Sequence, residues 1–347
     1  MYPISNQLSN KFANMSFICM LLVVLIHCYI PSAKGSCFWW FTEIIGGGAW
    51  LTGGFVRCAV PWFFLLSGFL LAGHIAELGW WVAALKKRVM SLLVPYFFWS
   101  LVAAIPIFIY WIVFKQSFPE LKFILKALGL QICGLPLMKQ LWFLRCLFLC
   151  VVLSPLLVRG CSVRLLVILF MINFLYDLRL LPLGEFGYSF WGNMLSLSGL
   201  FYFALGIYLR LHSICLPKGL AFVIIFWIGS LSMLAAYAYC DFLGHWAKNI
   251  FKSLSIPFSL VALWCCVPVK RFSDKFIRNT FSVYCIHILA FVYARRLLPE
   301  DLDSRCSTYL FVVLAVVYSL MLFGSLAMAE AMRRVMPKTS RIAFGGR

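Results

Sequence analysis

Long runs of apolar residues are the feature that most limits how this chain can fold. A helix that crosses the hydrocarbon core of a bilayer needs about 20 mostly apolar residues, and ten segments meet that requirement. These segments lie near residues 12–30, 49–73, 90–114, 141–158, 163–181, 193–210, 219–239, 250–268, 279–298 and 307–332. The sequence therefore predicts an all-α, polytopic integral membrane protein with about ten transmembrane helices.

Composition excludes the soluble classes of protein. The chain is 64% hydrophobic and 12% charged, whereas a soluble domain is roughly 45–50% apolar and about 25% charged. A soluble fold has too little interior to bury so much apolar surface. Residues 1–347 are therefore predicted to form a single transmembrane domain. The longest loop, near residues 115–140, has lysines spaced as in an amphipathic surface helix.

The distribution of charge predicts the orientation. The chain has 30 Lys and Arg against 11 Asp and Glu, a net charge of +19. In a membrane protein such an excess gathers in cytoplasmic loops, and no basic run interleaved with aromatic residues suggests nucleic acid. With the N-terminus inside, most loop Lys and Arg fall in inner segments, together with few acids. Both termini are therefore predicted to be cytoplasmic, in a multi-pass protein of a bacterial inner or plasma membrane.

Several other features of the sequence disfavour particular kinds of processing, binding site and transport. The first apolar run has one upstream charge, Lys11, and contains a histidine, so we do not expect cleavage as a signal peptide. The 14 cysteines lie mostly in apolar stretches without a CxxC pair, so we expect neither a disulfide framework nor a metal site. HExxH and G-x-x-x-x-G-K-[ST] motifs are absent from the sequence. Carboxylates within the spans are scarce, which disfavours proton-coupled transport.

Ionisable residues inside spans are candidates for function, because they are costly in a bilayer. His27 lies towards the outer end of the first span, and a neutral imidazole suits a general base near pH 7. A structural hydrogen bond to a neighbouring helix is the alternative. Arg57 lies four residues before Pro61, which has no N–H, so the helix should kink there and free the carbonyl of residue 57.

Further candidates lie in the second, fourth and ninth spans. Arg145 opens the fourth span at the outer side, where it either binds a substrate or only extends to lipid headgroups. Thr280, Tyr284 and His287 share one face of the ninth span, which should face the bundle as a catalytic or a structural network. Ser67 and Gly68 permit close helix packing. The remaining histidines, His74, His212 and His245, are expected at the surface.

Six segments, taken in order, resemble the integral membrane acyltransferase 3 family. They are Met20–His27, Ala59–Leu71, Lys86–Trp99, Leu141–Arg145, Phe201–Tyr208 and Ser282–His287. The resemblance implies transfer of an acyl group, usually acetyl from acetyl-CoA, to a hydroxyl of an envelope, capsular or exported glycan or of a lipid-linked sugar.

On this resemblance His27 is the expected base. Arg57 and Arg145 are expected to bind the acceptor or stabilise the oxyanion, and Tyr284 and His287 to orient groups or move protons. The basic cluster Lys86, Lys87 and Arg88 is expected to hold the CoA phosphates.

The chain departs from the family at one position of the first helix. The family has an arginine eleven residues before the histidine, about 16 Å away along one helix face. This chain has Ser16 there, so Lys11 or the cluster at residues 86–88 is expected to substitute. Two alternatives remain open. One is a non-catalytic glycan or lipid exporter, and the other is a lipid-modifying membrane acyltransferase of another fold.

Overall fold

The computed structural model describes residues 4–28, 30, 32–45, 54–115, 120–130, 135–214, 219–239, 245–295 and 302–346, and the regular elements in these ranges are helices. The chain divides into two compact units that alternate along the sequence. Unit 1 comprises Met1–Leu66, Phe174–Leu180 and Ser213–Ala329, and unit 2 comprises Ser67–Asn173, Leu181–His212 and Glu330–Arg347.

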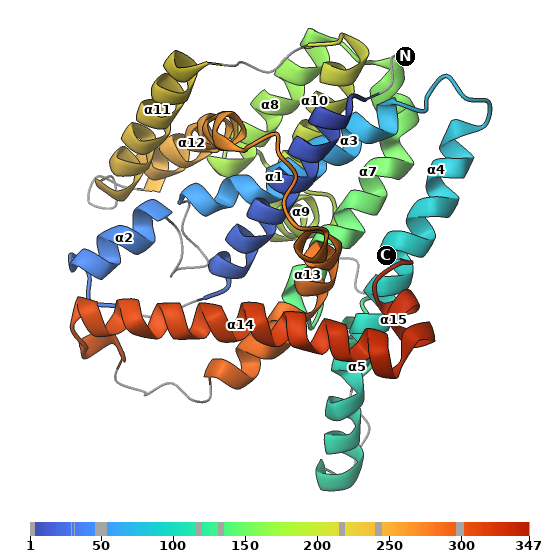
Figure 1. Cartoon of the computed structure of the whole chain (residues 1–347), viewed down its shortest axis with the longest axis vertical. Helices are drawn as coiled ribbons and strands as arrows, with labels where there is room; N and C mark the ends of the chain where they lie inside the picture. Colours follow the sequence, from blue (N-terminus) through green and yellow to red (C-terminus); the bar gives the residue numbers. More distant parts are fainter. Residues whose placement is uncertain are drawn as a thin grey trace. The chain divides into compact units, whose positions relative to one another are not determined.

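Unit 1 contains the first helix and most of the C-terminal third of the chain. Its elements are α1 (Asn6–Ile26), α2 (Cys37–Ile45), η1 (Phe55–Cys58), α11 (Leu220–Tyr239), α12 (His245–Cys266), α13 (Asp274–Arg295), η6 (Leu302–Ser304), the start of α3 (Ala59–Ala72) and most of α14 (Ser307–Val335). Within this unit α11 and α12 lie side by side (Figure 1), and α1 packs against α13.

Unit 2 contains the central helices and the C-terminal one. Its elements are the rest of α3, α4 (Trp80–Arg88), η2 (Val89–Leu93), α5 (Val94–Tyr110), η3 (Trp111–Lys115), α6 (Leu121–Ala127), η4 (Lys139–Leu141), α7 (Trp142–Arg159), most of α8 (Val163–Asp177), α9 (Gly184–Ser189), η5 (Phe190–Met194), α10 (Leu197–Leu211) and α15 (Pro337–Ala343). A Cβ atom on Gly68 would collide with the backbone of Phe203, so this glycine does permit the close packing of α3 on α10 that the sequence predicts.

Eight helices in the described ranges are long and apolar enough to cross a membrane. They are Asn6–Ile26, Phe55–Ala72, Trp80–Phe114, Lys139–Arg159, Gly184–Leu211, Leu220–Tyr239, Ala247–Cys266 and Ser307–Val335. The all-α polytopic fold is therefore confirmed, but the predicted number of ten spans is not.

The two remaining predicted spans coincide with helices that are not among these eight candidates. The span predicted at 163–181 is α8, which has 15 residues and stops before Arg179, whose φ of 59° places it in the left-handed region that ends helices. The span predicted at 279–298 coincides with α13, which has 22 residues but begins with a polar turn. Residues 296–298 lie outside the described ranges.

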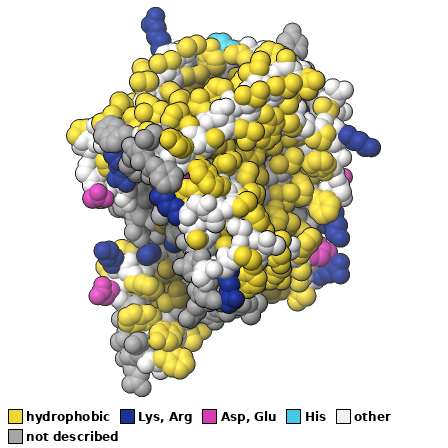
Figure 2. Space-filling view, turned by 90° about the vertical axis from the view of Figure 1, so that its left-hand side faces the viewer, with side chains coloured by type: hydrophobic (Ala, Val, Ile, Leu, Met, Phe, Trp, Pro, Cys, Tyr) yellow, Lys and Arg dark blue, Asp and Glu magenta, His cyan; other side chains and the backbone are white. Residues whose placement is uncertain are grey.

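The outer surface of several helices is apolar, as contact with lipid requires. Large hydrophobic side chains are exposed along α5, α8, α11 and α14, among them Ile109, Ile168, Ile225 and Phe323. Hydrophobic side chains also cover most of the face that Figure 2 shows. Such a surface would be an aggregation hazard in water but is the expected one in a bilayer.

In the described part of the loop expected near 115–140 the structure has the short helix α6, with its last turn at Lys126 and Ala127, and η4 begins at Lys139. Residues 116–119 and 131–134 of this loop lie outside the described ranges. Tyr96 of α5 anchors the end of α6, because its hydroxyl donates to the carbonyl of Gly129 at 2.6 Å.

Candidate functional site

Two histidines from distant parts of the sequence meet inside unit 1. The ring centroids of His27 and His287 lie 5.1 Å apart, with the ring planes inclined by 44°. His27 caps the C-terminal end of α1, and His287 lies in the middle of α13. The packing of α1 on α13 therefore brings the two candidate proton-transfer groups together.

The hydrogen bonds of His287 show which of its ring nitrogens carries the free lone pair. Its Nδ1 lies 2.8 Å from the carbonyl oxygen of Tyr284 and 3.1 Å from that of Val283. A carbonyl only accepts, so we assign the proton of the neutral ring to Nδ1, which leaves a lone pair on Nε2. Nε2 is buried without a hydrogen-bond partner among the described residues. A buried polar atom in that state is uncommon, and its lone pair can accept a hydrogen bond from a neighbouring group.

His27 is the more accessible of the pair. Its side chain is half-buried, whereas His287 is fully buried. The next residue, Cys28, is buried against Met321 of α14, with 3.4 Å between the two sulfur atoms. The end of α1 is thus packed against α14 at Cys28, whereas the His27 ring stays half-buried.

The polar stripe of α13 faces the interior, as its spacing predicts. Tyr284 is buried, its ring stacks on Phe281 at 5.9 Å, and its centroid lies 6.1 Å from that of His287. Thr280 presents a buried hydroxyl oxygen one turn earlier, without a hydrogen-bond partner among the described residues. Tyr284 therefore lies beside His287 on the buried face of α13.

Arg57 lies in the short 3₁₀ turn η1, which packs against α1 and α12. The kink expected from Pro61 takes the form of this tightened turn, since α3 begins at Ala59 and Pro61 occupies its first turn, where the missing N–H is tolerated. Arg57 lies within electrostatic range of Lys252 and of the buried Tyr237. The guanidinium is thus part of a buried polar region of unit 1.

This polar region contains charged residues that the sequence analysis did not single out. Lys248 lies 3.5 Å from the buried carboxylate of Glu43 and 4.7 Å above the ring of Tyr237. Asp177 accepts a hydrogen bond of 2.8 Å from Ser253 and attracts Lys252. The signal available in the sequence was the spacing of Lys248 and Lys252, four residues apart on an apolar helix.

Ser16, at the position of the family arginine, belongs to an aromatic cluster. Its hydroxyl donates to the carbonyl of Phe12 at 2.8 Å and accepts from Nε1 of Trp62 at 3.1 Å. Phe12, Trp62 and Trp264 have ring centroids within 5.9 Å of one another. The ammonium of Lys11 lies 4.5 Å above the Trp264 ring. Ser16 therefore supports packing here, and Lys11 is the nearby cation of this cluster.

Asn14 is a positioning residue that the sequence analysis missed. It is fully buried, its amide donates to the carbonyls of Pro268 and Lys270 at 2.9 and 2.8 Å, and its carbonyl accepts from the N–H of Phe272 at 2.9 Å. These three bonds attach the loop before α13 to α1. A buried amide in an apolar helix was the available signal.

The other predicted site residues lie in unit 2. Arg145 is 7% exposed on α7 and lies within electrostatic range of Tyr96. Lys86, Lys87 and Arg88 form the last turn of α4, where Lys86 and Lys87 are exposed. His74 and His212 are exposed, as expected. The side chain of His245 lies outside the described residues.

No three His, Cys, Asp or Glu side chains of the described residues gather as metal ligands do. The described cysteines are free thiols, and several are fully buried, such as Cys19, Cys58 and Cys150.

Comparison with known proteins gives one match. No curated protein and no solved structure matches the chain. The model of one family, described as an acyltransferase domain, matches residues 14–329. That range includes both histidines of the pair and the candidate spans from α1 to α14. Because this family model matches nearly the whole chain, the chain belongs to the acyltransferase 3 family of membrane proteins.

Proposed function

We propose that this membrane acyltransferase moves an acetyl group from acetyl-CoA to a hydroxyl of an envelope, capsular or exported polysaccharide. The observation that carries the proposal is the pairing of His27 with His287 at 5.1 Å. Membership of the family supports acyl transfer as the reaction, and the histidine pair provides a base for it.

In the proposed mechanism the half-buried His27 removes the proton of the acceptor hydroxyl. The resulting oxygen nucleophile attacks the thioester carbonyl and forms a tetrahedral oxyanion. Collapse of this intermediate breaks the carbon–sulfur bond, and the CoA thiolate takes the proton back from His27. A positioned base of this kind contributes roughly 10²–10⁴-fold to the rate.

His287 acts on His27 from the buried side. Its Nε2 lone pair is available because Nδ1 is committed to backbone carbonyls. We infer that His287 orients the His27 ring, directly or through one water, and stabilises its protonated form. Tyr284 holds this arrangement in place by its contact with His287.

The two arginines are proposed to stabilise the negative charge that develops during acyl transfer or to bind the acceptor. Arg57 is the candidate of unit 1, since its turn packs against α1, and a guanidinium stabilises an oxyanion or binds an acceptor through paired hydrogen bonds. Arg145, which belongs to unit 2, is proposed to bind the acceptor. We further propose that both termini are cytoplasmic, that acyl-CoA arrives from that side, and that the acceptor lies at the outer side of a cell membrane.

The test is acyl transfer by the purified protein in lipid nanodiscs, with labelled acetyl-CoA and candidate glycans. Mass spectrometry of surface glycans from cells with and without the protein identifies the acceptor. Loss of acetyl groups from one glycan would support the proposal. Movement of a glycan or lipid without thioester consumption would instead identify an exporter and overturn it.

A further inference from the structure

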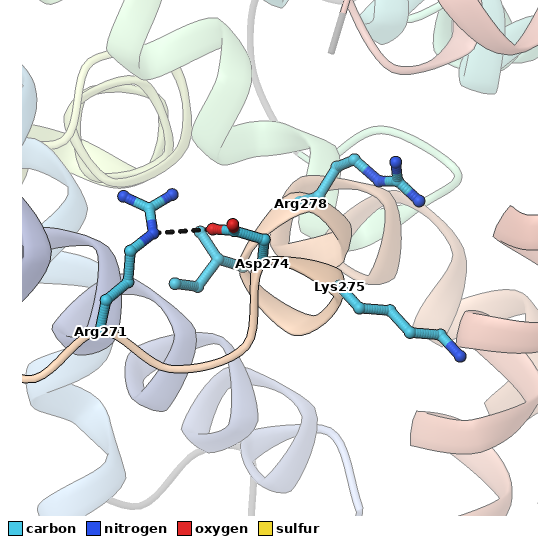
Figure 3. A pocket seen from close by; sticks show the side chains of 5 residues that line it. Arg271, Asp274, Lys275 and Arg278 are labelled. Carbon is cyan, nitrogen blue, oxygen red and sulfur yellow. Dashed lines mark hydrogen bonds and ion pairs between the residues drawn. The ribbon is translucent and has the colours of Figure 1, made fainter.

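A basic cavity lies at the start of α13, in unit 1. It has a volume of about 570 Å³ and is lined by Arg271, Asp274, Lys275, Ile277 and Arg278. Arg271 Nε lies 2.8 Å from Asp274 Oδ1, whereas Lys275 and Arg278 extend from α13 away from this ion pair (Figure 3). Three cations and one carboxylate give the cavity a positive charge, which suits an anion.

The cavity is joined to α1 by hydrogen bonds. Asn14 binds both sides of Arg271 in the sequence, through the carbonyl of Lys270 and the N–H of Phe272. Phe17, one turn further along α1, stacks on Phe276 at 5.6 Å. The basic cavity is therefore held at a defined level of the α1–α13 pair.

The histidine pair lies further along the same two helices. Asn14 and His27 are 13 residues apart on α1, and Asp274 and His287 are 13 residues apart on α13. At 1.5 Å per residue each separation is about 20 Å. Because residue 14 meets the 268–272 loop and residue 27 meets residue 287, the helices run in the same general direction. The cavity and the histidine pair thus lie at two levels of the same helix pair, about 20 Å apart.

We propose that this cavity binds the phosphate groups of acyl-CoA, and that the pantetheine arm follows α1 and α13 to the histidine pair. The inference rests on the proposed function and adds the location of the donor site. CoA has phosphates at one end and the thioester at the other, joined by a long, narrow arm. That shape fits cations and a base separated by about 20 Å along two helices. Lys275 and Arg278 supply the phosphate contacts.

The sequence offers a second basic group for this role, Lys86, Lys87 and Arg88. These residues belong to unit 2 and end α4. The α13 cavity is the better-supported donor site because Asn14 and Asp274 connect it to the helices that carry His27 and His287. The comparison of these two groups is part of the test.

The experiment measures KM and kcat for three donors in nanodiscs of neutral phosphatidylcholine and, in parallel, in nanodiscs that contain anionic lipid. The donors are acetyl-CoA, acetyl-dephospho-CoA and acetyl-pantetheine, which carry successively fewer phosphates. The variants are K275Q/R278Q, the matched control K338Q/R341Q, which removes an exposed Lys–Arg pair of the same spacing on α15, and K86Q/K87Q/R88Q.

K275Q/R278Q is expected to raise KM for acetyl-CoA by about 10-fold with little change in kcat, because a phosphate contact binds ground and transition states alike. KM for acetyl-pantetheine should not change, and the control pair should behave as wild type. D274N should lower KM for acetyl-CoA, since it frees Arg271 for phosphate.

Three results would overturn the proposed site. One is an unchanged KM for acetyl-CoA in K275Q/R278Q, above all if K86Q/K87Q/R88Q raises it. Another is an equal loss with acetyl-pantetheine, which would mean a structural defect. The third is an effect seen only in nanodiscs of anionic lipid, which would identify a lipid headgroup site. A wild-type protein that consumes none of the three thioesters would refute the proposed function itself, independently of the variants.

Discussion

His27 and His287 lie with their ring centroids 5.1 Å apart, although 260 residues separate them in the sequence. One ring ends a helix and is half-buried, and the other lies fully buried in the middle of a helix with Nδ1 bound to backbone carbonyls. This asymmetry predicts different roles for the two residues. In the proposed mechanism the half-buried ring of His27 meets the substrate, and the buried ring of His287 positions it.

Replacement of His27 by Ala should leave the protein inserted and folded, because a small apolar residue fits the end of an apolar helix. Acyl transfer should fall by roughly 10²–10⁴-fold, the usual contribution of a positioned base. The measurement is transfer from labelled acetyl-CoA by purified, monodisperse protein. Near-normal turnover of this variant would eliminate His27 as the base.

Replacement of His287 by Ala should reduce transfer less, by about 10-fold, and should lower the melting temperature because the change leaves a cavity. The decisive variant combines both changes. If His287 acts through His27, the double variant should be no slower than His27→Ala alone, since residues that work as a unit are not additive. Independent, additive losses would contradict the positioning role. Complete loss of turnover in well-folded His287→Ala would move the catalytic role to α13.

Two substitutions of Arg57 should separate the effect of its charge from that of its paired hydrogen bonds. Arg57→Lys keeps the charge but loses the paired hydrogen bonds of a guanidinium, whereas Arg57→Met removes both. Loss of an oxyanion-stabilising group costs about 10²–10³ in kcat, so Arg57→Met should fall in that range and Arg57→Lys should be milder. A change confined to KM for the acceptor would assign Arg57 to acceptor binding. Wild-type kinetics in Arg57→Met would remove it from the site.

Asn14→Ala should loosen the loop before α13. The substitution leaves two carbonyls and one N–H without their partner, and each unsatisfied buried group costs about 1–3 kcal/mol. We expect a lower melting temperature and faster hydrogen exchange at Phe272, with a raised KM for acetyl-CoA. Unchanged exchange in this loop would show that the three hydrogen bonds do not hold it.

The predicted topology can be mapped by cysteine accessibility in a cysteine-free background. Single cysteines at positions 86 and 338 should react only with reagents that reach the cytoplasm, and one at position 34 should react from outside. The reason is the excess of Lys and Arg in the inner segments. Labelling of position 86 from outside intact cells would reverse the orientation and with it the side from which acyl-CoA enters.

The sequence alone determined the membrane class, because runs of about 20 apolar residues and a low content of charge are local properties. It also determined which faces are buried, as the spacing of Thr280, Tyr284 and His287 correctly predicted. It overestimated the length of α8, because hydropathy does not register the left-handed conformation of Arg179, which ends the helix early.

Only the tertiary structure decided which residues meet. The contact of His27 with His287, the three hydrogen bonds of Asn14 and the electrostatic interactions of Arg57 all join segments far apart in the chain. Helical periodicity shows which face of a helix is buried, but the neighbour of that face depends on how the helices pack. The ring nitrogen of His287 that keeps a free lone pair was therefore fixed by backbone carbonyls and packing, which no local pattern of residues encodes.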